Sequence, residues 1–472
     1  MILEIAWKNI WRSKIRSLVV IVAIGVGLLG GITAVAFMNG MLTGRIDDAL
    51  EIEVSSMQIH NAKFMENTEL QYLIDDADNL MQKIESIPTV TAASKRLIIE
   101  TMVSSNRSAS GVKLIGVEPE KEKLVTKLYE KLVDSNSFYF EGIKRRPILI
   151  GAKLAEKLKV HVRSKIAINT VDIDGVSIRS VYRVVGIFKT QNSGFDGMNA
   201  FIRFSDMQKM LSIEDGKAHE IAFMLDEMLE TEALKTELQK QYTKYKIDDR
   251  SLLKIRNDSV PQTIYSRVKE LKASVEYSKT DFDNKLLTTL TEDEFLQYSA
   301  QINESCESGL NISEWKQLSP ELAMQTTWMD FILYVFVGII LAALGFGIVN
   351  TMLMVVLERI REIGMLIAIG MNRRRVFAMI VLESVMLSLV GGFVGIFLGW
   401  SVVSMLHTTG IDMSMFSDGL QAIGYPSLIY PELKTSSYFQ ITIMVIITGI
   451  LAAIYPALHA VKLNPSEAIR KA

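Results

Sequence analysis

The stretch LVVIVAIGVGLLGGITAVAF, residues 18–37, decides the fold class of this chain. It runs for 20 residues without a charged side chain, and a helix of that length crosses a hydrocarbon core of about 30 Å at a rise of about 1.5 Å per residue. Three further apolar runs cover residues 331–357, 376–406 and 438–458, with Glu383 as the one charge among them. The sequence therefore predicts an α-helical membrane protein with four transmembrane helices.

The predicted helices are arranged as one plus three. We place them at residues 18–38, 328–357, 376–406 and 438–458. About 290 residues, 39–327, separate the first helix from the second, which is enough for a large folded domain. The segments 358–375 and 407–437 are too short to form a domain of that size.

Lysine and arginine near the ends of the runs predict the orientation. They gather before the first run, between the second and third, and after the fourth: Lys8, Arg12, Lys14, Arg16, Arg359, Arg361, Arg373, Arg374, Arg375, Lys462, Arg470 and Lys471. The loop 407–437 has only Lys434. Both termini, residues 1–17 and 459–472, are therefore predicted to be cytoplasmic, as is segment 358–375, and the large domain is predicted to be extracytoplasmic.

A cleavable signal peptide is the alternative for the first run, because Ala34, Val35 and Ala36 resemble a cleavage site. The run is longer than the roughly 7–15 residues of a signal-peptide core, and its removal would leave an odd number of spans. An uncleaved anchor fits better. Apolar residues at helical spacing before it predict an amphipathic helix, residues 1–17, on the cytoplasmic membrane surface.

Composition excludes several classes of function. The 51 Lys plus Arg nearly balance 53 Asp plus Glu, so the chain has no basic footprint for nucleic acid. The single cysteine, Cys306, permits no intrachain disulfide, and five scattered histidines supply no zinc motif. The sequence has no phosphate-binding GxxxxGK[ST] loop, so we expect any ATP to be hydrolysed by another subunit.

The large domain is predicted to be α+β, because short β-branched runs alternate with helical patterns. Asp174-Gly175 and Ser193-Gly194 are predicted turns. The predicted strands are residues 54–60, 97–103, 165–171, 177–188, 200–204 and 221–225, and the predicted helices are residues 77–87, 152–158 and 230–241. Residues 245–312 are polar, and we predict a helical, solvated insertion there.

Glycines in the apolar runs predict close helix packing. Gly25, Gly27 and Gly30 also match GxGxxG, but a nucleotide-binding turn does not fit inside a membrane span. Gly27 and Gly31 form one small-residue pair, and Gly391, Gly395 and Gly399 form a stripe on one helix face. The sequence leaves open whether their partner helix belongs to this chain or to a second one.

The segment ERIREIGMLIAIG, residues 358–370, predicts a short amphipathic helix parallel to the membrane on the cytoplasmic side. Glu383 lies close to the same membrane boundary, where a carboxylate needs a partner. We expect it to pair with an arginine or to cap a neighbouring helix.

These motifs resemble those of FtsX-like ABC transporter permeases of the MacB and lipoprotein-releasing type. The resemblance covers AWKNIWR at residues 6–12, the segment 358–375, LES at 382–384 with Gly391-Gly392, and YPA at 455–457 with LNPSEAIR at 463–470. MQIH at residues 57–60 and residues 315–322 look closest to the lipoprotein-releasing LolC/LolE branch. Two departures are Arg163-Ser164, where the family usually has Gly-Asp, and the insertion at about 245–312.

The resemblance implies a non-catalytic permease subunit of the inner membrane that binds no cofactor itself. It would pair with a second permease chain, itself or a paralogue, and rest a coupling helix on a cytoplasmic ATPase that holds ATP and magnesium. Family membership implies that the coupling residues are Glu358, Arg359, Arg361, Glu362, Ile363, Gly364, Met365, Leu366, Ala368 and Gly370.

The implied cargo is lipoprotein, extracted from membrane lipid and passed to a periplasmic carrier by mechanotransmission through the large domain. Two alternatives remain open: a MacB-like efflux permease, and an FtsX-like regulator that activates a cell-wall hydrolase. A membrane-anchored enzyme is disfavoured, since the sequence contains no recognisable catalytic constellation.

Overall fold

The computed structural model describes residues 7, 11–12, 14–65, 67–133, 137–140, 146–226, 231–257, 260–273 and 277–462. The chain divides into two compact units. The helical unit comprises residues 1–45, 324–417 and 426–472, and the large unit comprises residues 46–323 and 418–425. Most of the predicted amphipathic helix at 1–17, and residues 463–472 of the predicted tail, lie outside the described residues.

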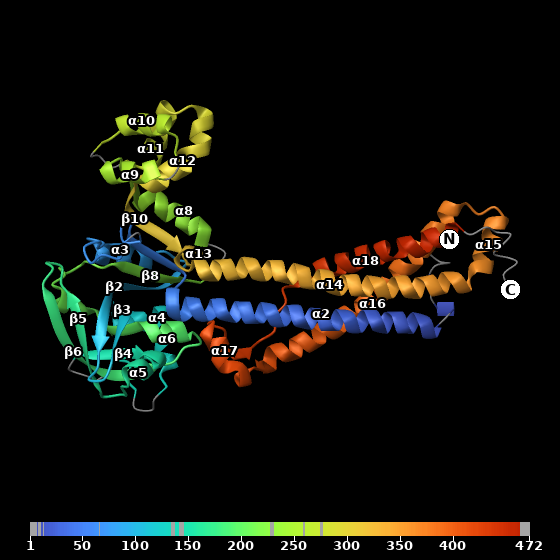
Figure 1. Ribbon diagram of the computed structural model, residues 1–472, viewed down its shortest axis with the longest axis horizontal. Helices are drawn as coiled ribbons and strands as arrows, with labels where there is room; N and C mark the ends of the chain where they lie inside the picture. The colour runs from blue at the N-terminus through green and yellow to red at the C-terminus, as the bar shows by residue number, and fades with distance from the viewer. Residues whose placement is uncertain are drawn as a thin grey trace. The chain divides into compact units, whose positions relative to one another are not determined.

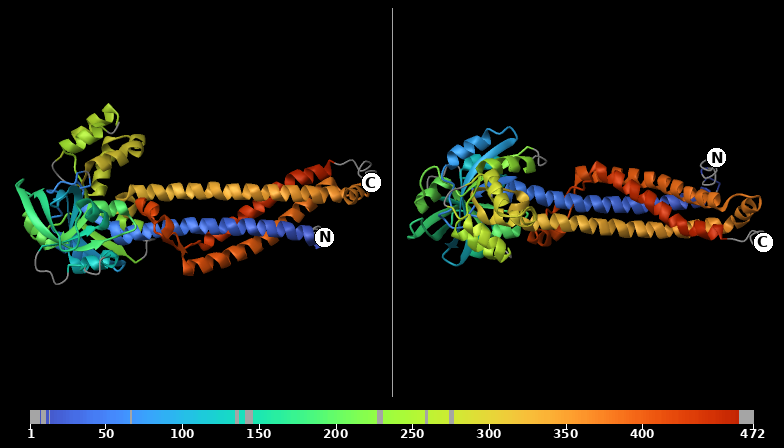
Figure 2. Two further views of the ribbon diagram at one scale, coloured as in Figure 1. Left: turned by 60° about the horizontal axis from the view of Figure 1, so that its bottom comes forward. Right: turned by 90° about the horizontal axis from the view of Figure 1, so that it is seen from above.

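Four long helices build the helical unit: α2 (Lys14–Asp48), α14 (Pro320–Glu358), α16 (Arg373–Thr409) and α18 (Thr435–Val461). Each is long and apolar enough to cross a membrane, as the sequence predicts. All four extend beyond the apolar runs that identify them, and α16 is inclined to α2 and α14 (Figures 1 and 2).

Two short segments complete the helical unit. Helix α15 (Ile360–Ala368) connects α14 to α16. Strands β11 (Ile411–Asp412) and β12 (Leu428–Ile429) pair in the loop between α16 and α18, with the 3-10 turn η4 (Ser414–Phe416) between them. Helix α17 (Ser417–Ala422) follows η4, and residues 418–425 belong to the large unit.

A ring of six strands forms the centre of the large unit. In order around the ring these are β2 (Val90–Ser104), β3 (Ala109–Val117), β7 (Asn199–Arg203), β4 (Pro147–Gly151), β6 (Ser177–Phe188) and β5 (Lys165–Val171). The ring closes because β2 pairs with both β3 and β5. Strand β2 also pairs with β8 (Glu220–Leu225), and the sheet continues through β1 (Met57–Asn61), β10 (Glu307–Glu314) and β9 (Thr243–Tyr245). The predicted α+β class is confirmed.

Both faces of β4 are buried, because neighbouring residues on this strand enter different cores. On β4, Ile148 and Ile150 join the core formed with α3 (Ala77–Glu85), α5 (Ala152–Leu158) and α7 (Phe204–Leu211). Leu149 faces the opposite way, into an aromatic core that includes Phe188 and Phe201. This explains why β4 reads as a continuous apolar run, whereas β6 alternates between exposed and buried residues over its first half.

The predicted insertion is a small helical subdomain with its own core. Its helices are α9 (Asp249–Asn257), α10 (Gln262–Glu270), α11 (Lys279–Thr289) and α12 (Glu292–Cys306), and they form a separate group in Figure 1. Ile255, Val268, Phe282 and Leu286 are fully buried among them. The prediction that residues 245–312 are helical is wrong at the C-terminal end, since β10 begins at Glu307 and joins the sheet. The prediction that the segment is solvated did not include the buried core among its helices.

Other local predictions need correction. The strand predicted at 54–60 begins only at Met57, because residues Ala49–Val54 form one wide turn of π-helix, η1. The turn predicted at Ser193-Gly194 is the start of helix α6 (Ser193–Met198), which Asn192 caps. The strand predicted at 97–103 is part of the much longer β2, and β3 was not predicted. Helix α8 (Thr231–Tyr242) lies where a helix was expected.

Candidate functional site

Helix α15 is the centre of the candidate site. It begins after Arg359, where the backbone leaves the helical conformation of α14. It ends at Ala368, and Gly370, two residues later, has a φ of 101° in the left-handed region that favours glycine. The N–H of Met371 donates to the carbonyl of Leu366 over 3.0 Å, which closes a Schellman motif. The Asn372 side chain then accepts from the N–H of Arg374 and caps α16.

The predicted coupling residues divide between two faces of this segment. One face is exposed to solvent and ends in Ile369, which is 87% exposed. The exposed residues are Glu358, Arg361, Met365, Ala368 and Gly370. The other face turns toward α14 and α16, with Ile363 and Gly364 buried and Arg359, Glu362 and Leu366 half-buried. Arg361, Met365 and Ala368 are spaced by four and three residues, so they form one ridge with Ile369.

A chain of alternating charges fixes the inner face of α15. Nη1 of Arg359 lies 3.4 Å from Oε1 of Glu383 on α16, and its Nε lies 3.3 Å from Oε2 of Glu362. Nη2 of Arg12 lies 2.8 Å from Oε1 of Glu362. Glu383 is only 7% exposed. The prediction that this carboxylate pairs with an arginine is confirmed, and the chain of charges connects three segments of the helical unit.

A cavity of about 110 Å³ adjoins these charges. Arg359, Glu362 and Glu383 line it together with apolar side chains of α14, α15 and α16. Packing voids next to a joint between helices leave room for the helices to shift against each other. The joint between α15 and α16 combines these charge pairs with the apolar packing of Ile363.

The predicted glycines make close contacts between helices of this chain. An ideal Cβ on Gly395 would lie 2.7 Å from the Cβ of Leu28, and one on Gly399 would lie 2.9 Å from Ile32. Gly391 faces Ile24 in the same way. On another side of α2, a Cβ on Gly27 would lie 2.6 Å from Leu344, and Gly31 faces Ile340 of α14. Helix α2 therefore lies in a groove of α16, while α14 packs against the glycines of α2.

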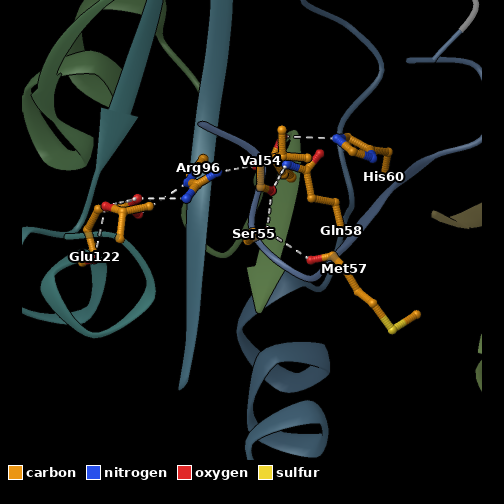
Figure 3. Close-up of polar contacts among 9 residues, drawn as sticks. Val54, Ser55, Met57, Gln58, His60, Arg96 and Glu122 are labelled. Carbon is orange, nitrogen blue, oxygen red and sulfur yellow. Dashed lines mark hydrogen bonds and ion pairs between the residues drawn. The ribbon is translucent and has the colours of Figure 1, made fainter. Parts of the chain in front are cut away.

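A second polar cluster lies inside the large unit. The Arg96 guanidinium on β2 is buried between two carboxylates, 2.7 Å from Glu122 and 2.7 Å from Glu220 on β8. Glu220 also lies 3.0 Å from Nε2 of His60 on β1. In Figure 3 the Arg96 side chain lies between Glu122 on one side and the residues of β1, Gln58 and His60, on the other. One charge network thus joins three adjacent strands and helix α4 (Pro119–Val125).

Electrostatics hold this cluster in a defined protonation state. Burial by itself raises the pKa of Glu220, but the Arg96 guanidinium and the bond from His60 outweigh it and lower that pKa to about 2. Burial lowers the pKa of neighbouring His219 to about 4, so its ring is neutral at pH 7. The neutral ring accepts from the N–H of Ile98 at Nδ1 and donates to the carbonyl of Leu70 from Nε2.

The connection from α2 to this network is short. After η1, Ser55 has a φ of 70°, and its N–H donates to the carbonyl of Leu50 over 3.0 Å. The Gln58 amide donates to the carbonyl of Val54 over 2.5 Å, as Figure 3 shows. Strand β1 begins two residues after Ser55. Two residues, Ser55 and Ser56, separate η1 from β1, the strand that carries His60.

Comparison with known families accounts for both units. Residues 334–465 match the FtsX-like permease C-terminal family, and residues 17–241 match the MacB-like periplasmic core domain. Between them, the two family models match the chain to an FtsX-like permease with a MacB-like periplasmic core domain. The first match covers α15 and the helices around it, and the second covers α2 and the ring of strands.

This permease is similar to named relatives over part of its length. It is 28% identical over 200 residues to an uncharacterized ABC transporter permease, YknZ of Bacillus subtilis, covering 41% of this chain and 46% of that one. It is 36% identical over 138 residues to a macrolide export ATP-binding/permease protein, MacB of Rhodopirellula baltica, covering 29% of this chain and 17% of the relative. The crystal structure of the periplasmic region of MacB from Actinobacillus actinomycetemcomitans aligns with a TM-score of 0.30 and 7% identity, over 59% of this chain and 97% of that one.

Sequence reasoning missed several residues of the permease that the structure singles out. A buried network joins Arg96, Glu220 and His60. In the sequence, only the charge of Arg96 directly before the apolar strand predicted at 97–103 pointed to it. Gly40 was not singled out either, although its contact with the loop after α16 is the tightest of the helical glycines in the described residues. Within the part of the chain that the structure describes, no cluster of His, Cys, Asp and Glu could hold a metal ion.

Proposed function

We propose that this chain is the permease subunit of an ABC transporter and that it transmits the ATP-driven movement of a separate ATPase to its large domain. The observation that carries the proposal is the division of α15 into an exposed ridge and a charge-paired inner face. The ridge of Arg361, Met365, Ala368 and Ile369 offers apolar and cationic contacts to a partner. The inner face fixes the same helix to α16.

This movement has a direct route through the helical unit. A push on the ridge acts on Arg359 and hence on Glu383 of α16. Helix α16 carries the glycine stripe in which α2 lies, so a movement of α16 shifts α2 as well. Helix α2 leads through η1 into β1, where His60 connects to Glu220 and Arg96. Where glycines bring α2 and α16 into direct contact, a displacement of one helix moves the other.

The proposed topology follows the positive-inside rule, with α15 and both termini in the cytoplasm and the large domain on the other side of the inner membrane. A second copy or a paralogue completes the membrane part. ATP and magnesium bind to the ATPase partner and not to this chain.

For the cargo we propose lipoprotein, released from the outer leaflet of the inner membrane and transferred to a periplasmic carrier. The likeness of MQIH at residues 57–60 to the lipoprotein-releasing branch supports this cargo. A MacB-like efflux function is the second candidate, and the macrolide export proteins among the relatives support it equally.

Co-purification tests the proposal. We expect a P-loop ATPase to be retained by the wild-type chain and lost from Met365→Asp and Ile369→Asp, because a carboxylate on the ridge must be desolvated on docking. Lys462→Asp, exposed at the end of α18, is the matched control and should retain the ATPase. An ATPase that binds all three variants alike would refute the role of the ridge.

The cargo requires a separate measurement. Triacylated lipoprotein in the purified complex, released on addition of ATP, supports lipoprotein release. A complex that retains the ATPase and an outer-membrane channel protein but no lipoprotein would favour efflux. A cell-wall hydrolase in place of both would favour the regulator.

A further inference from the structure

The loop between α16 and α18 exposes two large apolar side chains. In Figure 1 the chain turns at the end of α16 and returns to α18 through this loop. Met415 is 88% exposed and Phe416 is 59% exposed. Both lie in η4, directly after β11. Side chains of this size are rarely so exposed to water in pairs, so their surroundings in the working protein need an explanation.

The backbone of this turn is well satisfied. The N–H of Met413 donates to the carbonyl of Ser427 over 2.7 Å, and that of Phe416 donates to the carbonyl of Met413 over 2.8 Å. The N–H of Ser414 donates to the Asp412 carboxylate over 2.8 Å. In a poorly hydrated environment every such group must find a partner inside the protein. The turn can therefore leave bulk water without losing hydrogen bonds at these positions.

The loop is fixed to the end of α2. The N–H of Glu432 donates to the carbonyl of Ala36 over 3.0 Å. An ideal Cβ on Gly40 would lie 2.0 Å from the carbonyl oxygen of Tyr430, and Gly44 faces Pro426. These contacts come from residues 426–432, which are joined to the turn by the pairing of β11 with β12, so the turn is connected to this end of α2.

The apolar surface of α16 continues to the turn. No charged side chain lies between Glu383 and the end of α16 at Thr409. Trp400 and Met405 are exposed on its last turns, and Met405 is 68% exposed. Tryptophan is enriched where a span leaves the hydrocarbon. The turn therefore lies next to the membrane boundary that these side chains mark.

We propose that Met415 and Phe416 insert into the interfacial region of the leaflet on the large-domain side, so that the turn anchors the end of α2 to a lipid surface. Lipid is favoured over a protein partner because the turn continues the lipid-facing surface of α16. Asp412 is exposed directly before the turn, where the polar headgroup region would receive it. The inference rests on the helices spanning a membrane and not on the identity of the cargo.

Site-directed nitroxide labelling tests the anchor. The single cysteine, Cys306, is buried, so a Cys306→Ser full-length chain is a suitable background. Met415→Cys and, independently, Phe416→Cys are labelled in nanodiscs of phosphatidylcholine and phosphatidylglycerol. Collision rates are measured with oxygen, which concentrates in lipid, and with a nickel chelate, which stays in water.

References within the same chain define both limits. Phe331→Cys reports an exposed position in the span of α14, and Leu296→Cys reports an exposed apolar position in the helical subdomain. We expect the labels at 415 and 416 to favour oxygen over nickel by several-fold, as at 331 and unlike at 296. Labels that favour nickel as at 296 would overturn the proposal. Labels shielded from both reagents would also overturn it and indicate a protein cover, either the large domain or a second copy.

Discussion

Gly40 on α2 and Tyr430 in the loop after α16 approach so closely that a Cβ on Gly40 would lie 2.0 Å from the Tyr430 carbonyl oxygen. The obstacle is backbone and not the flexible end of a side chain. We therefore predict that Gly40→Ala destabilises the helical unit by about 1–3 kcal/mol, because either α2 or the loop must move. The measurement is the thermal aggregation temperature in detergent.

Gly30 provides a matched control on the same helix. A Cβ there would meet nothing within 4 Å. Gly30→Ala should leave stability unchanged or raise it by up to about 1 kcal/mol through helix propensity. Equal effects of the two substitutions would show that helix propensity, and not the contact with Tyr430, governs the response.

The pair of Arg359 and Glu383 predicts a non-additive double mutant. Arg359→Met leaves a largely buried carboxylate without this partner, and Glu383→Leu leaves the guanidinium with Glu362 but without its contact to α16. We expect each single variant to lower both stability and ATPase coupling, and the double variant to recover part of the stability. A coupling free energy of about 0.5–3 kcal/mol from the cycle would fit the observed contact. Additive losses would mean that the pair contributes nothing.

Arg163 offers a test of backbone strain. Its φ of 75° lies in the left-handed region, and the family resemblance places a glycine there. Glycine would remove about 1–2 kcal/mol of backbone strain from the native state. Glycine also increases the conformational entropy of the unfolded chain, which opposes this gain, so we predict that Arg163→Gly stabilises the large unit by up to about 1 kcal/mol. Arg179→Gly, exposed on the regular strand β6, should instead cost about 1 kcal/mol. Urea unfolding midpoints measure both, and a loss for Arg163→Gly would contradict the assignment of strain.

His219 predicts a dependence of stability on pH. Burial lowers its pKa from 6.5 to about 4, so between these values the unfolded chain binds a proton that the native chain does not. Stability should therefore fall as the pH falls from 6.5 to 4, by up to about 3 kcal/mol. His219→Asn, which keeps an acceptor for the Ile98 N–H, should flatten the profile of urea midpoints across this range.

Two other buried groups would not produce the same profile. The lowered pKa of Glu220 acts only as the pH falls from 4.5 toward 2. Burial raises the pKa of Asp196 to about 6. As the pH falls from 6, the native chain therefore binds a proton before the unfolded chain does, and the native state gains stability. A wild-type profile that His219→Asn leaves unchanged would assign the effect elsewhere.

The spans and the hairpin of β5 and β6 were predictable because their signals are local. Lipid tolerates no charge, so the apolar runs stand out, and Asp174-Gly175 provides the positive φ that a tight turn needs. The turn between β2 and β3 has no such signal. The Ser105 hydroxyl replaces it by accepting from the N–H groups of Arg107 and Ser108.

The candidate site was predictable only in part, for a similar reason. The segment that forms α15 is continuous, so its amphipathic pattern can be read along the chain. Which of its faces turns inward depends on Glu383 and Arg12, which are distant in sequence. The network of Arg96, Glu220 and His60 depends on strand order, and no local pattern encodes that order.

The helical subdomain begins after β9 and ends at β10, and these two strands pair with each other, Tyr245 opposite Glu307. The chain therefore leaves the sheet and re-enters it at neighbouring points, so the distance its ends must bridge does not depend on what lies between them. A tight turn could replace about sixty residues without altering the ring of strands. The subdomain is in this sense an exchangeable module, free to be lost, enlarged or rebuilt in evolution while the rest of the protein is kept.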